Sequence, residues 1–406
     1  MTGLFDVLIV GGGPVGACAG TLLVRGSSNS LSPLRVCVLE PKRPRPPAAD
    51  TPLESRVVAI SRASERILNS AGAWNRIRGP RVAAYERMRI WHESTSCAGA
   101  LVFDAAEVGE PNLGYIIENR LLQAGLLDEF VASGGHLQSA DFQNLRVGPD
   151  TVTVDTSAGT VSAKLVIGAD GARSAVRESV GLTATVADFN ETAIVATVAT
   201  ERPHEKTAWQ RFMRTGTLAF LPLADGTSSI VWSADNNIAT NLIALSAADF
   251  ESELDRASDL ALGPTRLVSE RSAFPLKRVS AHRYVTQRCA LIGDAAHVVH
   301  PLAGQGVNLG MLDAAALAQL ILAARAERED PGALRVLRQY ERWRKSEVAF
   351  MSTAIDAFDR FLAHGSGPLS RLAQRGLSWV GRSQEIKRLF VNRALGVAGE
   401  LPRAAR

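Results

Sequence analysis

The chain has 406 residues, of which 46% are hydrophobic and 21% are charged, and it carries a formal net charge of +4. These values are ordinary for a globular protein with a well-formed core, and the length suits one large domain or two closely joined ones. A membrane-spanning helix is not expected, because no uninterrupted apolar run reaches the roughly 18–20 residues of a span. A signal peptide is not expected either, because the first residues lack a basic segment and lead directly into a predicted strand.

The net charge hides an uneven distribution along the chain. Residues 332–406 contain 14 Lys and Arg against 6 Asp and Glu, a balance of +8, so the preceding residues carry −4. A basic region suits nucleic acid, an anionic membrane surface or an acidic partner, and it is equally typical of a solvated helix face. Basic and aromatic residues do not interleave elsewhere in the sequence, so we expect no nucleic-acid partner.

The four cysteines are scattered and form no Cys-x-x-Cys pair. Cys18, Cys37 and Cys289 lie in apolar segments, whereas Cys97 does not. The three are interpreted as buried thiols of a reducing compartment, which predicts a cytoplasmic protein without a disulfide framework.

The first forty residues predict a strand, a glycine turn, a helix and a second strand. Residues 5–10 (FDVLIV) form a short apolar run, GGGPVG follows, and residues 17–26 have a helical pattern. Residues 34–40 (LRVCVLE) form the second strand. This is the βαβ arrangement that opens a dinucleotide-binding domain.

The next segments predict a loop, helices and strands in turn. Residues 41–52 (PKRPRPPAADTP) are rich in proline and predict a loop, whereas residues 61–77 predict one helix that ends near Gly79. Residues 114–133 predict a turn or strand followed by a helix. Alternating apolar residues around 147–154 and 160–167 predict a hairpin, whose last strand ends on the glycine turn GADG.

From about Phe189 to Phe274 the sequence is rich in strand-forming residues separated by turn signals, which predicts an inserted antiparallel domain. The segment RCALIGDAAH then returns to a short strand and a glycine turn, and the chain from Leu309 onward is mostly helical. We therefore expect a first part of the nucleotide-binding domain at 1–180, a mainly β substrate domain at 181–275, the final part of the nucleotide-binding domain at 276–330 and a basic helical region at 331–406.

The first glycine turn has the spacing and the context of a dinucleotide-binding fingerprint. Gly11, Gly13 and Gly16 follow a strand and open a helix. Gly11 permits the tight turn, Gly13 lets the backbone approach a pyrophosphate, and Gly16 allows close packing of helix on strand. The helix N-terminus favours the negative charge. Glu40, at the end of the second strand, suits hydrogen bonds to the hydroxyls of an adenosine ribose.

Two later turns place an acid beside a glycine at the end of a strand. The second turn contains Asp170 and Gly171, and the third contains Gly293 and Asp294. Such an acid can accept hydrogen bonds from a polyol or a ribose. Each turn taken alone is equally well interpreted as an ordinary turn after a strand.

Taken together, the three turns resemble those of the aromatic-ring hydroxylases, the single-component FAD monooxygenases related to p-hydroxybenzoate hydroxylase. That family has an N-terminal dinucleotide fingerprint, a central Asp-Gly motif and a later Gly-Asp motif, which stand here as GGGPVG, GADG and IGDAAH. The stretch HPLAGQGVNLGMLD, residues 300–313, is similar in every signature position to the ubiquinone-biosynthesis branch, with the pattern H-P-x-A/G-G-Q-G-x-N-x-G-x-x-D. The segments SRVVAIS and GYIIENRLLQ also resemble that branch, and the likeness extends over about residues 5–313.

The resemblance implies a fold of the α/β class (α+β overall). It consists of an FAD-binding Rossmann-like domain of the p-hydroxybenzoate hydroxylase type, an inserted antiparallel β-sheet substrate domain and a helical C-terminus. The implied cofactor is FAD, NAD(P)H or another electron donor is the reductant, and molecular oxygen is the co-substrate. The implied reaction is hydroxylation of the aromatic ring of a polyprenylated phenol in ubiquinone biosynthesis, through a C4a-hydroperoxyflavin. Arg56 and Arg120 fall where the family places flavin-contacting arginines.

Residues 301–308 are expected to lie against the face of the flavin ring. Glycines allow the backbone to approach the isoalloxazine closely, and the N-terminus of the following helix offers free N–H groups to the negatively charged reduced flavin. A glycine-rich loop that serves helix packing alone is the alternative. The residues expected in this loop are Pro301, Gly304, Gln305, Gly306, Val307 and Asn308.

His297 and His300 have a spacing that a metal site can use, but no second ligand cluster accompanies them, so no metal is expected. His300 is interpreted as a supporting or capping histidine more readily than as a catalytic base. No catalytic base is therefore assigned.

The β-rich insert is expected to cover the flavin ring, with the aromatic substrate between the two domains. Phe220 and Trp232 could line this site, although aromatic residues on strands belong more often to a core.

A polyprenylated phenol is a lipid, so the enzyme must work at a membrane or take its substrate from a carrier. In residues 383–395 the apolar side chains fall near one helical face with basic residues around it. These apolar residues are Ile386, Leu389, Phe390 and Leu395. We expect peripheral contact with the inner face of the membrane through this region or, with equal weight, packing or homo-oligomer formation. Other ubiquinone-biosynthesis proteins are further candidate partners.

Two other functions fit parts of the sequence. The first is a hydroxylase of soluble aromatics or a relative of the flavin halogenases, although a W-x-W-x-I-P motif is missing from the sequence. The second is a non-catalytic flavoprotein that serves as a scaffold in a biosynthetic assembly. The sequence leaves open the hydroxylated carbon, the electron donor, the oligomeric state and the role of the C-terminal helices.

Overall fold

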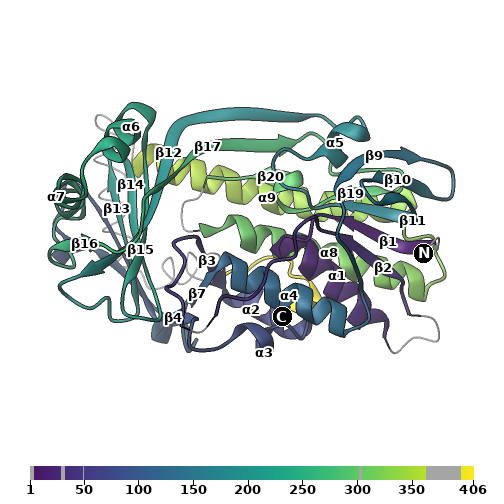
Figure 1. Ribbon diagram of the computed structural model, residues 1–406, viewed down its shortest axis with the longest axis horizontal. Helices are drawn as coiled ribbons and strands as arrows, with labels where there is room; N and C mark the ends of the chain where they lie inside the picture. Colours follow the sequence, from purple (N-terminus) through teal and green to yellow (C-terminus); the bar gives the residue numbers. More distant parts are fainter. Residues whose placement is uncertain (1–3, 29–32, 49, 301–303, 363–394) are drawn as a thin grey trace.

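The computed structural model describes residues 4–28, 33–48, 50–300, 304–362 and 395–406. The molecule is elongated, with a Rossmann-like domain at one end and a large mixed sheet at the other (Figure 1). Two long strands, β12 (Ala184–Thr200) and β17 (Ser272–Ala281), run side by side between these two ends.

The Rossmann-like domain is built on a sheet with the strand order β18-β19-β11-β1-β2-β8. Its central strands β19, β11, β1 and β2 are parallel neighbours. Runs such as VLIV and VCVL are buried, as expected for parallel strands that are covered on both faces. The bounds are β1 Phe5–Val10, β2 Val36–Leu39, β8 His136–Gln138, β11 Gly159–Gly168, β18 Val285–Thr286 and β19 Cys289–Leu291. The two strands predicted at 5–10 and 34–40 are confirmed.

An antiparallel extension continues this sheet beyond β11. β9 (Phe142–Val147) pairs with β10 (Val152–Thr156), and β10 pairs with the first half of β11. The hairpin predicted around 147–154 and 160–167 is therefore confirmed, with one further strand added to it.

Three long helices form the core beside this sheet. α1 (Pro14–Ser27) packs against both α4 (Asn119–Ala132) and α8 (Gly306–Ala326). By length and composition α8 could cross a membrane, but most of it is buried against its neighbours, as in the core helix of a globular domain. The short helix α5 (Ala175–Ser179) follows β11.

A small antiparallel sheet joins the Rossmann-like domain to the large sheet. It consists of β3 (Val57–Ser61), β7 (Gly114–Glu118) and β4 (Ala83–Tyr85), and α2 (Arg62–Ser70) follows β3 directly. The prediction of a single helix over 61–77 was wrong. Gly72, with a φ of +71°, interrupts it, and α3 (Trp74–Ile77) begins afresh. Helices commonly end at such a left-handed glycine.

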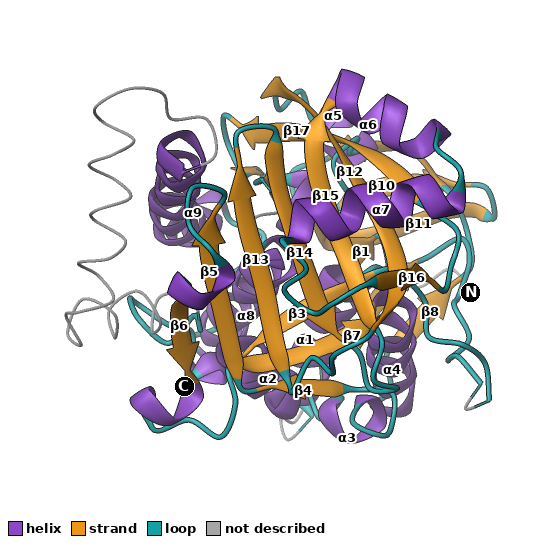
Figure 2. Ribbon diagram, turned by 90° about the vertical axis from the view of Figure 1, so that its left-hand side faces the viewer, coloured by secondary structure: helices purple, strands orange, loops and turns teal. Residues whose placement is uncertain are grey.

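The large sheet has the strand order β20-β17-β12-β15-β14-β13-β5-β6, and β16 pairs with β12. Helices α6 and α7 cover its outer face (Figure 2). The bounds are β5 Arg87–His92, β6 Leu101–Asp104, β13 Thr207–Met213, β14 Gly216–Pro222, β15 Ser228–Asp235, α6 Asn236–Ala244, α7 Ala247–Ser258, β16 Thr265–Leu267 and β20 His297–Val298.

The sheet differs in two respects from the antiparallel domain expected at 181–275. It includes β5 and β6 from a much earlier part of the chain, and β13 pairs with β5 in parallel. It also carries two helices, α6 and α7, within a stretch predicted to be mainly β. Phe220 and Trp232 point to the outer face, where they form a core with these helices, so they do not line the space between the domains.

The C-terminal region is helical only in part. α9 (Leu334–Leu362) agrees with the expectation, whereas Ile386, Leu389 and Phe390 lie outside the described residues. Residues 395–406 were predicted to be helical, but apart from a short 3-10 turn at Arg403–Ala405 they pack back onto the Rossmann-like domain in irregular conformation. The N–H of Ala63 donates to the carbonyl of Leu395, and Leu395 is buried.

Cys18, Cys37 and Cys289 are buried and unpaired, as the sequence predicted, and Cys97 is half-buried. Burial raises the pKa of each of the three buried thiols to about 12, so they are protonated and unreactive at neutral pH.

Candidate active site

The three glycine turns meet at one edge of the Rossmann-like sheet. They follow β1, β11 and β19, which are neighbouring parallel strands, and Glu40 follows the adjacent strand β2. Ligands of such sheets bind outside the carboxyl ends of the strands. The structure thus brings together the three turns and Glu40, which are far apart in the sequence.

Gly11 and Gly16 are required by the packing of the protein itself. A Cβ on Gly11 would lie 2.4 Å from the carbonyl oxygen of Ala169, and its φ is +103°. A Cβ on Gly16 would lie 2.0 Å from the carbonyl oxygen of Gly11. Both contacts are with backbone atoms that cannot move away, so the first two turns can lie this close only if both residues are glycine.

Gly13 has a different environment, although it belongs to the same motif. A Cβ on it would meet nothing within 4 Å, and its φ of −60° is open to any residue. It is the N-cap of α1, Pro14 follows it at the first helical position, and no side chain caps the helix. The free N–H groups of α1 therefore face open space beside Gly13, which is the arrangement that binds a phosphate.

Glu40 is held in place by backbone N–H groups. Gly12 donates to its Oε2 at 2.9 Å, and Lys42 donates to its Oε1 at 3.2 Å. Its carboxylate is oriented beside the glycine turn and retains accepting capacity for the hydroxyls of a sugar. Gln123, which the sequence analysis missed, donates to the carbonyl of Gly12 at 3.0 Å and supports the turn from α4.

Asp170 caps the helix that follows it. Ser174 Oγ donates to Asp170 Oδ1 at 2.6 Å, and the N–H of Val176 donates to Oδ2 at 3.0 Å. Both carboxylate oxygens thus bind the start of α5, so this acid shapes the turn whether or not it also contacts a ligand. Gly171, with a φ of +83° and open space around it, follows directly.

The third turn packs against the first helix and the start of α8. Gly293 has a φ of +57°, and a Cβ on it would lie 3.2 Å from the side chain of Val15. A Cβ on Gly310 would lie 2.6 Å from the same valine. The close approach of α8 to the third turn therefore depends on Gly310, a position that the sequence signature contains but that was not assigned a role.

Asp294 is open to solvent on one side and surrounded by protein on the others. This crowding raises the pKa of its carboxyl, while His297 and Arg56 act in the opposite direction. The positive charge of Arg56 thus acts on Asp294, although the two are far apart in the sequence. Arg56 is exposed just before β3.

Arg120, at the start of α4, forms an ion pair with Glu54, whose Oε1 lies 2.8 Å from Nε of the arginine. The Nε–H does not point at this oxygen, so the contact is an ion pair without a hydrogen bond. Arg120 and Arg56 both border the loop that ends at β3.

Arg81 organises the same loop and was missed by the sequence analysis. It donates to both carboxylate oxygens of the buried Glu118 at 2.7 Å, and to the carbonyls of Ala48, Thr51 and Pro52. Its guanidinium thereby fixes a loop that has no regular structure of its own. No local pattern in the sequence marks an arginine for this role.

The N-terminus of α8 is joined to β3 by Asn308. Its Oδ1 accepts a hydrogen bond from the N–H of Ser61 at 2.9 Å, and its Nδ2 donates to the carbonyl of Ala59 at 2.8 Å. Gly304, with a φ of +62°, packs against Ala59, where a Cβ would lie 3.2 Å away. The amide of Asn308 is thus used to brace the loop.

The other predicted residues of this loop are less constrained. Gln305 is the N-cap of α8, Gly306 has open space around its Cα, and Val307 packs against the core. Pro301 lies outside the described residues.

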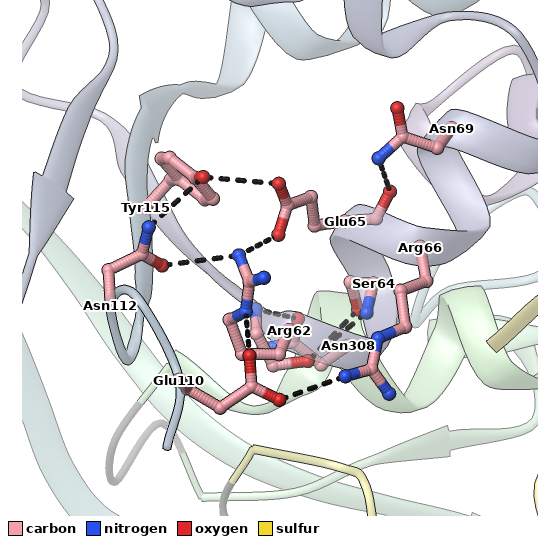
Figure 3. A network of polar contacts seen from close by, with 10 residues as sticks. Arg62, Ser64, Glu65, Arg66, Asn69, Glu110, Asn112, Tyr115 and Asn308 are labelled. Carbon is pink, nitrogen blue, oxygen red and sulfur yellow. Dashed lines mark hydrogen bonds and ion pairs between the residues drawn. The ribbon is translucent and has the colours of Figure 1, made fainter. Parts of the chain in front are cut away.

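A polar network around α2 adjoins this link between α8 and β3 (Figure 3). In α2, Arg62 binds Glu65 and Glu110, and Arg66 binds Glu110 at 2.9 Å. Tyr115 donates to Glu65 at 3.1 Å. The network fixes α2, whose N-cap Ser61 is the residue that Asn308 binds.

The two histidines bind different carboxylates. His297 Nε2 lies 2.5 Å from Oδ2 of Asp313, and Arg344 Nε lies 2.8 Å from Oδ1. Burial alone would raise the pKa of Asp313, but His297 and Arg344 outweigh it and lower the pKa. His300 Nε2 lies 3.0 Å from Oε2 of Glu191 on β12, which links the two ends of the molecule.

These features suit an extended dinucleotide with a polar ring system. The open N-terminus of α1 suits a pyrophosphate, Glu40 suits a ribose, and the braced N-terminus of α8 suits an electron-rich ring. Gly13, Gly171 and Gly306 leave room beside the turns, because a Cβ on each would meet nothing within 4 Å. The residues present therefore fit FAD.

The comparisons with known sequences agree with this reading. Residues 5–351 match the family described as "FAD binding domain". The chain is 37% identical over 397 residues to the ubiquinone hydroxylase UbiL of Rhodospirillum rubrum, covering 96% of this chain and 89% of that protein. It is 34% identical to the 3-demethoxyubiquinol 3-hydroxylase of Escherichia coli, covering 97% and 98%. It is 32% identical to the human mitochondrial ubiquinone biosynthesis monooxygenase COQ6, covering 92% and 89%.

Solved structures share the fold at low sequence identity. The p-nitrophenol 4-monooxygenase PnpA of Pseudomonas putida superimposes with a TM-score of 0.75 at 20% identity, covering 98% of this chain and all of the other. The flavin-dependent brominase Bmp2 superimposes with the same TM-score at 14% identity, covering 98% and 94%.

Proposed function

This chain belongs to the FAD-dependent aromatic-ring hydroxylases, in their ubiquinone-biosynthesis branch, and on this premise we propose that it hydroxylates the ring of a polyprenylated phenol on the route to ubiquinone. It is a flavoprotein monooxygenase with FAD as its cofactor. Two features support the proposal: the likeness to the named hydroxylases along nearly the whole chain, and the meeting of the three glycine turns and Glu40 at one edge of the Rossmann-like sheet.

The residues of the chain bind and orient the cofactor. The N-terminus of α1 beside Gly13 would hold the pyrophosphate, and Glu40, oriented by the N–H of Gly12, would accept hydrogen bonds from the adenosine ribose. Asp294, whose side chain is exposed at the third turn, would accept hydrogen bonds from hydroxyls of the ribityl chain. Arg56, on the loop that Arg81 fixes, and Arg120, at the start of α4, would contact the flavin.

When bound, FAD would supply the activation of molecular oxygen and the transfer of one oxygen atom to the ring, with NAD(P)H or another donor as the reductant. The N-terminus of α8 carries partial positive charge, which would stabilise the negative charge of a reduced flavin bound beside it. Gly304 and Gly306 allow the backbone to approach the ring, and Asn308 keeps this loop against β3. The large sheet and the Rossmann-like domain exclude water from the substrate between them.

A polyprenylated phenol is a lipid, and the chain must meet it at a membrane or on a carrier. The charge balance of +8 in residues 332–406 supports peripheral contact with the anionic inner face of the membrane. This contact can be measured by co-sedimentation with vesicles of anionic or neutral lipid. Binding to anionic vesicles that weakens with salt supports it, and equal recovery with both kinds argues for a soluble carrier or protein partner.

The function is tested by the lipid that accumulates when the protein is absent. In a strain lacking this chain, mass spectrometry of the quinone fraction should show a prenylated phenol that is one hydroxylation short of the next intermediate, and the wild-type gene should remove it. An unchanged quinone profile would contradict the proposal and direct attention to soluble aromatic substrates.

A further inference from the structure

The strand register defines which side of the large sheet faces the Rossmann-like domain. Successive residues of a strand point to opposite faces. Trp232 and Phe220 point outward into the core under α6 and α7, so the residues next to them in sequence point inward. The inner face is also identified by its contacts, since Ser229 Oγ donates to the carbonyl of Ser55 at 3.1 Å.

Two adjacent rows of side chains cross this inner face, as the pairing of four strands shows. One row consists of Val195, Val231, Ala219 and Gln210, and the next consists of Ala193, Ser233, Thr217 and Phe212. Val195, Val231 and Ala219 are half-buried, so the middle of the face is not sealed by the Rossmann-like domain. The domains touch on both sides of this opening, at Ser229 in the row below and at Glu191 in the row above.

Three polar side chains on this face lack a partner. Gln210 is 4% exposed, Thr217 is 5% exposed and Ser233 is 4% exposed, and none of them forms a side-chain hydrogen bond within the described residues. The side-chain nitrogen and oxygen atoms of these residues are not fully buried, so they face open space. Polar groups that line an opening and have no partner in their own chain are available to bind the polar atoms of a ligand.

The three groups lie close enough to act on one small ring. Thr217 is directly opposite Ser233 on the neighbouring strand. Gln210 is opposite Ala219, two residues from Thr217 on the same face, which makes Gln210 and Thr217 diagonal neighbours. Such neighbours are about 7–8 Å apart at Cα, within reach of a glutamine side chain. Beside them, Ala219, Val231 and Val195 offer a surface of small apolar groups.

We propose that Gln210, Thr217 and Ser233 form the subsite that recognises the oxygen substituents of the aromatic substrate and thereby selects the ring carbon presented to the flavin. This assignment rests on the proposed function. An amide both donates and accepts hydrogen bonds, as does a hydroxyl, so the three groups can bind phenol, phenolate or methoxy oxygens. The half-buried valines and alanine contact the apolar part of the ring and the start of its tail.

The test compares variants that remove one polar group while conserving volume. Gln210→Met and Ser233→Ala are the test variants, and Ser228→Ala is the matched control, because its hydroxyl is also unpartnered and buried on β15 but points to the outer face. Each purified holoenzyme is assayed with two prenylated phenols that differ by one ring oxygen substituent. The readouts are KM, the fraction of reductant that yields product rather than hydrogen peroxide, and the position of hydroxylation.

We expect full FAD content in all three variants. Gln210→Met or Ser233→Ala should raise KM roughly two- to tenfold for the phenol with the additional oxygen and far less for the phenol without it. Peroxide release should rise, and the hydroxylated position should become mixed. A purely structural role would change both substrates alike, and Gln210→Asn, which keeps the amide, should recover part of the preference.

Two outcomes would overturn the assignment, and they are distinguishable. If the wild-type enzyme hydroxylates these phenols but both variants keep its substrate preference and its product, the subsite lies elsewhere and the proposed function stands. If the wild-type holoenzyme hydroxylates no prenylated phenol, the proposed function fails and this assignment fails with it.

Discussion

Gly13→Ala should separate the binding of FAD from the folding of the protein. A Cβ at Gly13 meets no protein atom within 4 Å, and its φ of −60° suits alanine. Alanine is a poorer N-cap than glycine by about 1 kcal/mol, but it gains about 0.4–1 kcal/mol by restricting the unfolded chain. The free energy of unfolding of the FAD-free protein should therefore change by less than about 1 kcal/mol.

The same methyl group would occupy the space next to the pyrophosphate. Crowding of a close contact costs about 1–3 kcal/mol, which corresponds to about a 5- to 150-fold increase in the Kd for FAD. Urea unfolding of the FAD-free protein and titration by flavin fluorescence measure the two quantities separately. Gly99→Ala is the matched control, since its Cβ would also meet nothing and it lies far from the turns, and it should bind FAD normally.

Gly16→Ala should behave in the opposite way. Its Cβ would lie 2.0 Å from the carbonyl oxygen of Gly11, so the FAD-free protein itself should be strongly destabilised. If Gly13→Ala binds FAD as tightly as the wild type, the pyrophosphate does not lie at the start of α1, and the assignment of this turn is refuted.

Three further predictions concern the supports of the site. Asn308→Ala removes the link from α8 to β3 and leaves backbone groups at Ser61 and Ala59 unpaired, so urea unfolding should show a loss of about 2–4 kcal/mol; a neutral result would contradict the bracing role. Because the pKa of Asp313 is lowered, its carboxylate stabilises the fold fully at pH values above 3.8, the ordinary pKa of an aspartate. This stabilisation is lost as the pH falls through the lowered pKa. Asp313→Asn should lower the free energy of unfolding by about 3–5 kcal/mol and make thermal unfolding less dependent on acidic pH. An unchanged pH profile would show that Asp313 is not the source of this dependence. Arg81→Lys keeps the charge but loses contacts to three loop carbonyls, so proteolysis within residues 41–56 should accelerate and FAD affinity should fall, unless the loop is held by other groups.

The strands and turns of the nucleotide site could be predicted because their signals are local. Each glycine turn follows a short apolar strand in the sequence, and parallel strands place such turns at one edge of the sheet. The individual glycines nevertheless have different roles. Gly11 and Gly16 serve protein packing, whereas Gly13 faces open space, a distinction that depends on neighbours such as Ala169.

Long-range pairing accounts for most of what the sequence did not predict. β5 and β6 join the large sheet by pairing with β13, which lies more than a hundred residues later in the chain, and no local pattern announces this. The same holds for Arg81, whose partners come from two distant segments. By contrast, the end of α2 at Gly72 carried a local signal, because a glycine after an apolar helical run commonly ends a helix.

The roles of some polar residues depend on which partners the fold supplies. Asp170 was expected to bind the cofactor, but in the structure both its oxygens cap α5. Asn308 was expected at the flavin, and in the structure its amide joins α8 to β3. Spacing predicts that these residues belong to the site, and the fold shows which protein groups they bind.

Isotopic labelling of molecular oxygen tests most directly whether this protein hydroxylates a polyprenylated phenol. The purified protein, loaded with FAD, is given a reductant, isotopically labelled molecular oxygen and a polyprenylated phenol, and the lipid product is examined by mass spectrometry. We predict one labelled oxygen atom on the aromatic ring of the product. Consumption of reductant with release of hydrogen peroxide and no labelled lipid, for every prenylated phenol offered, would contradict it.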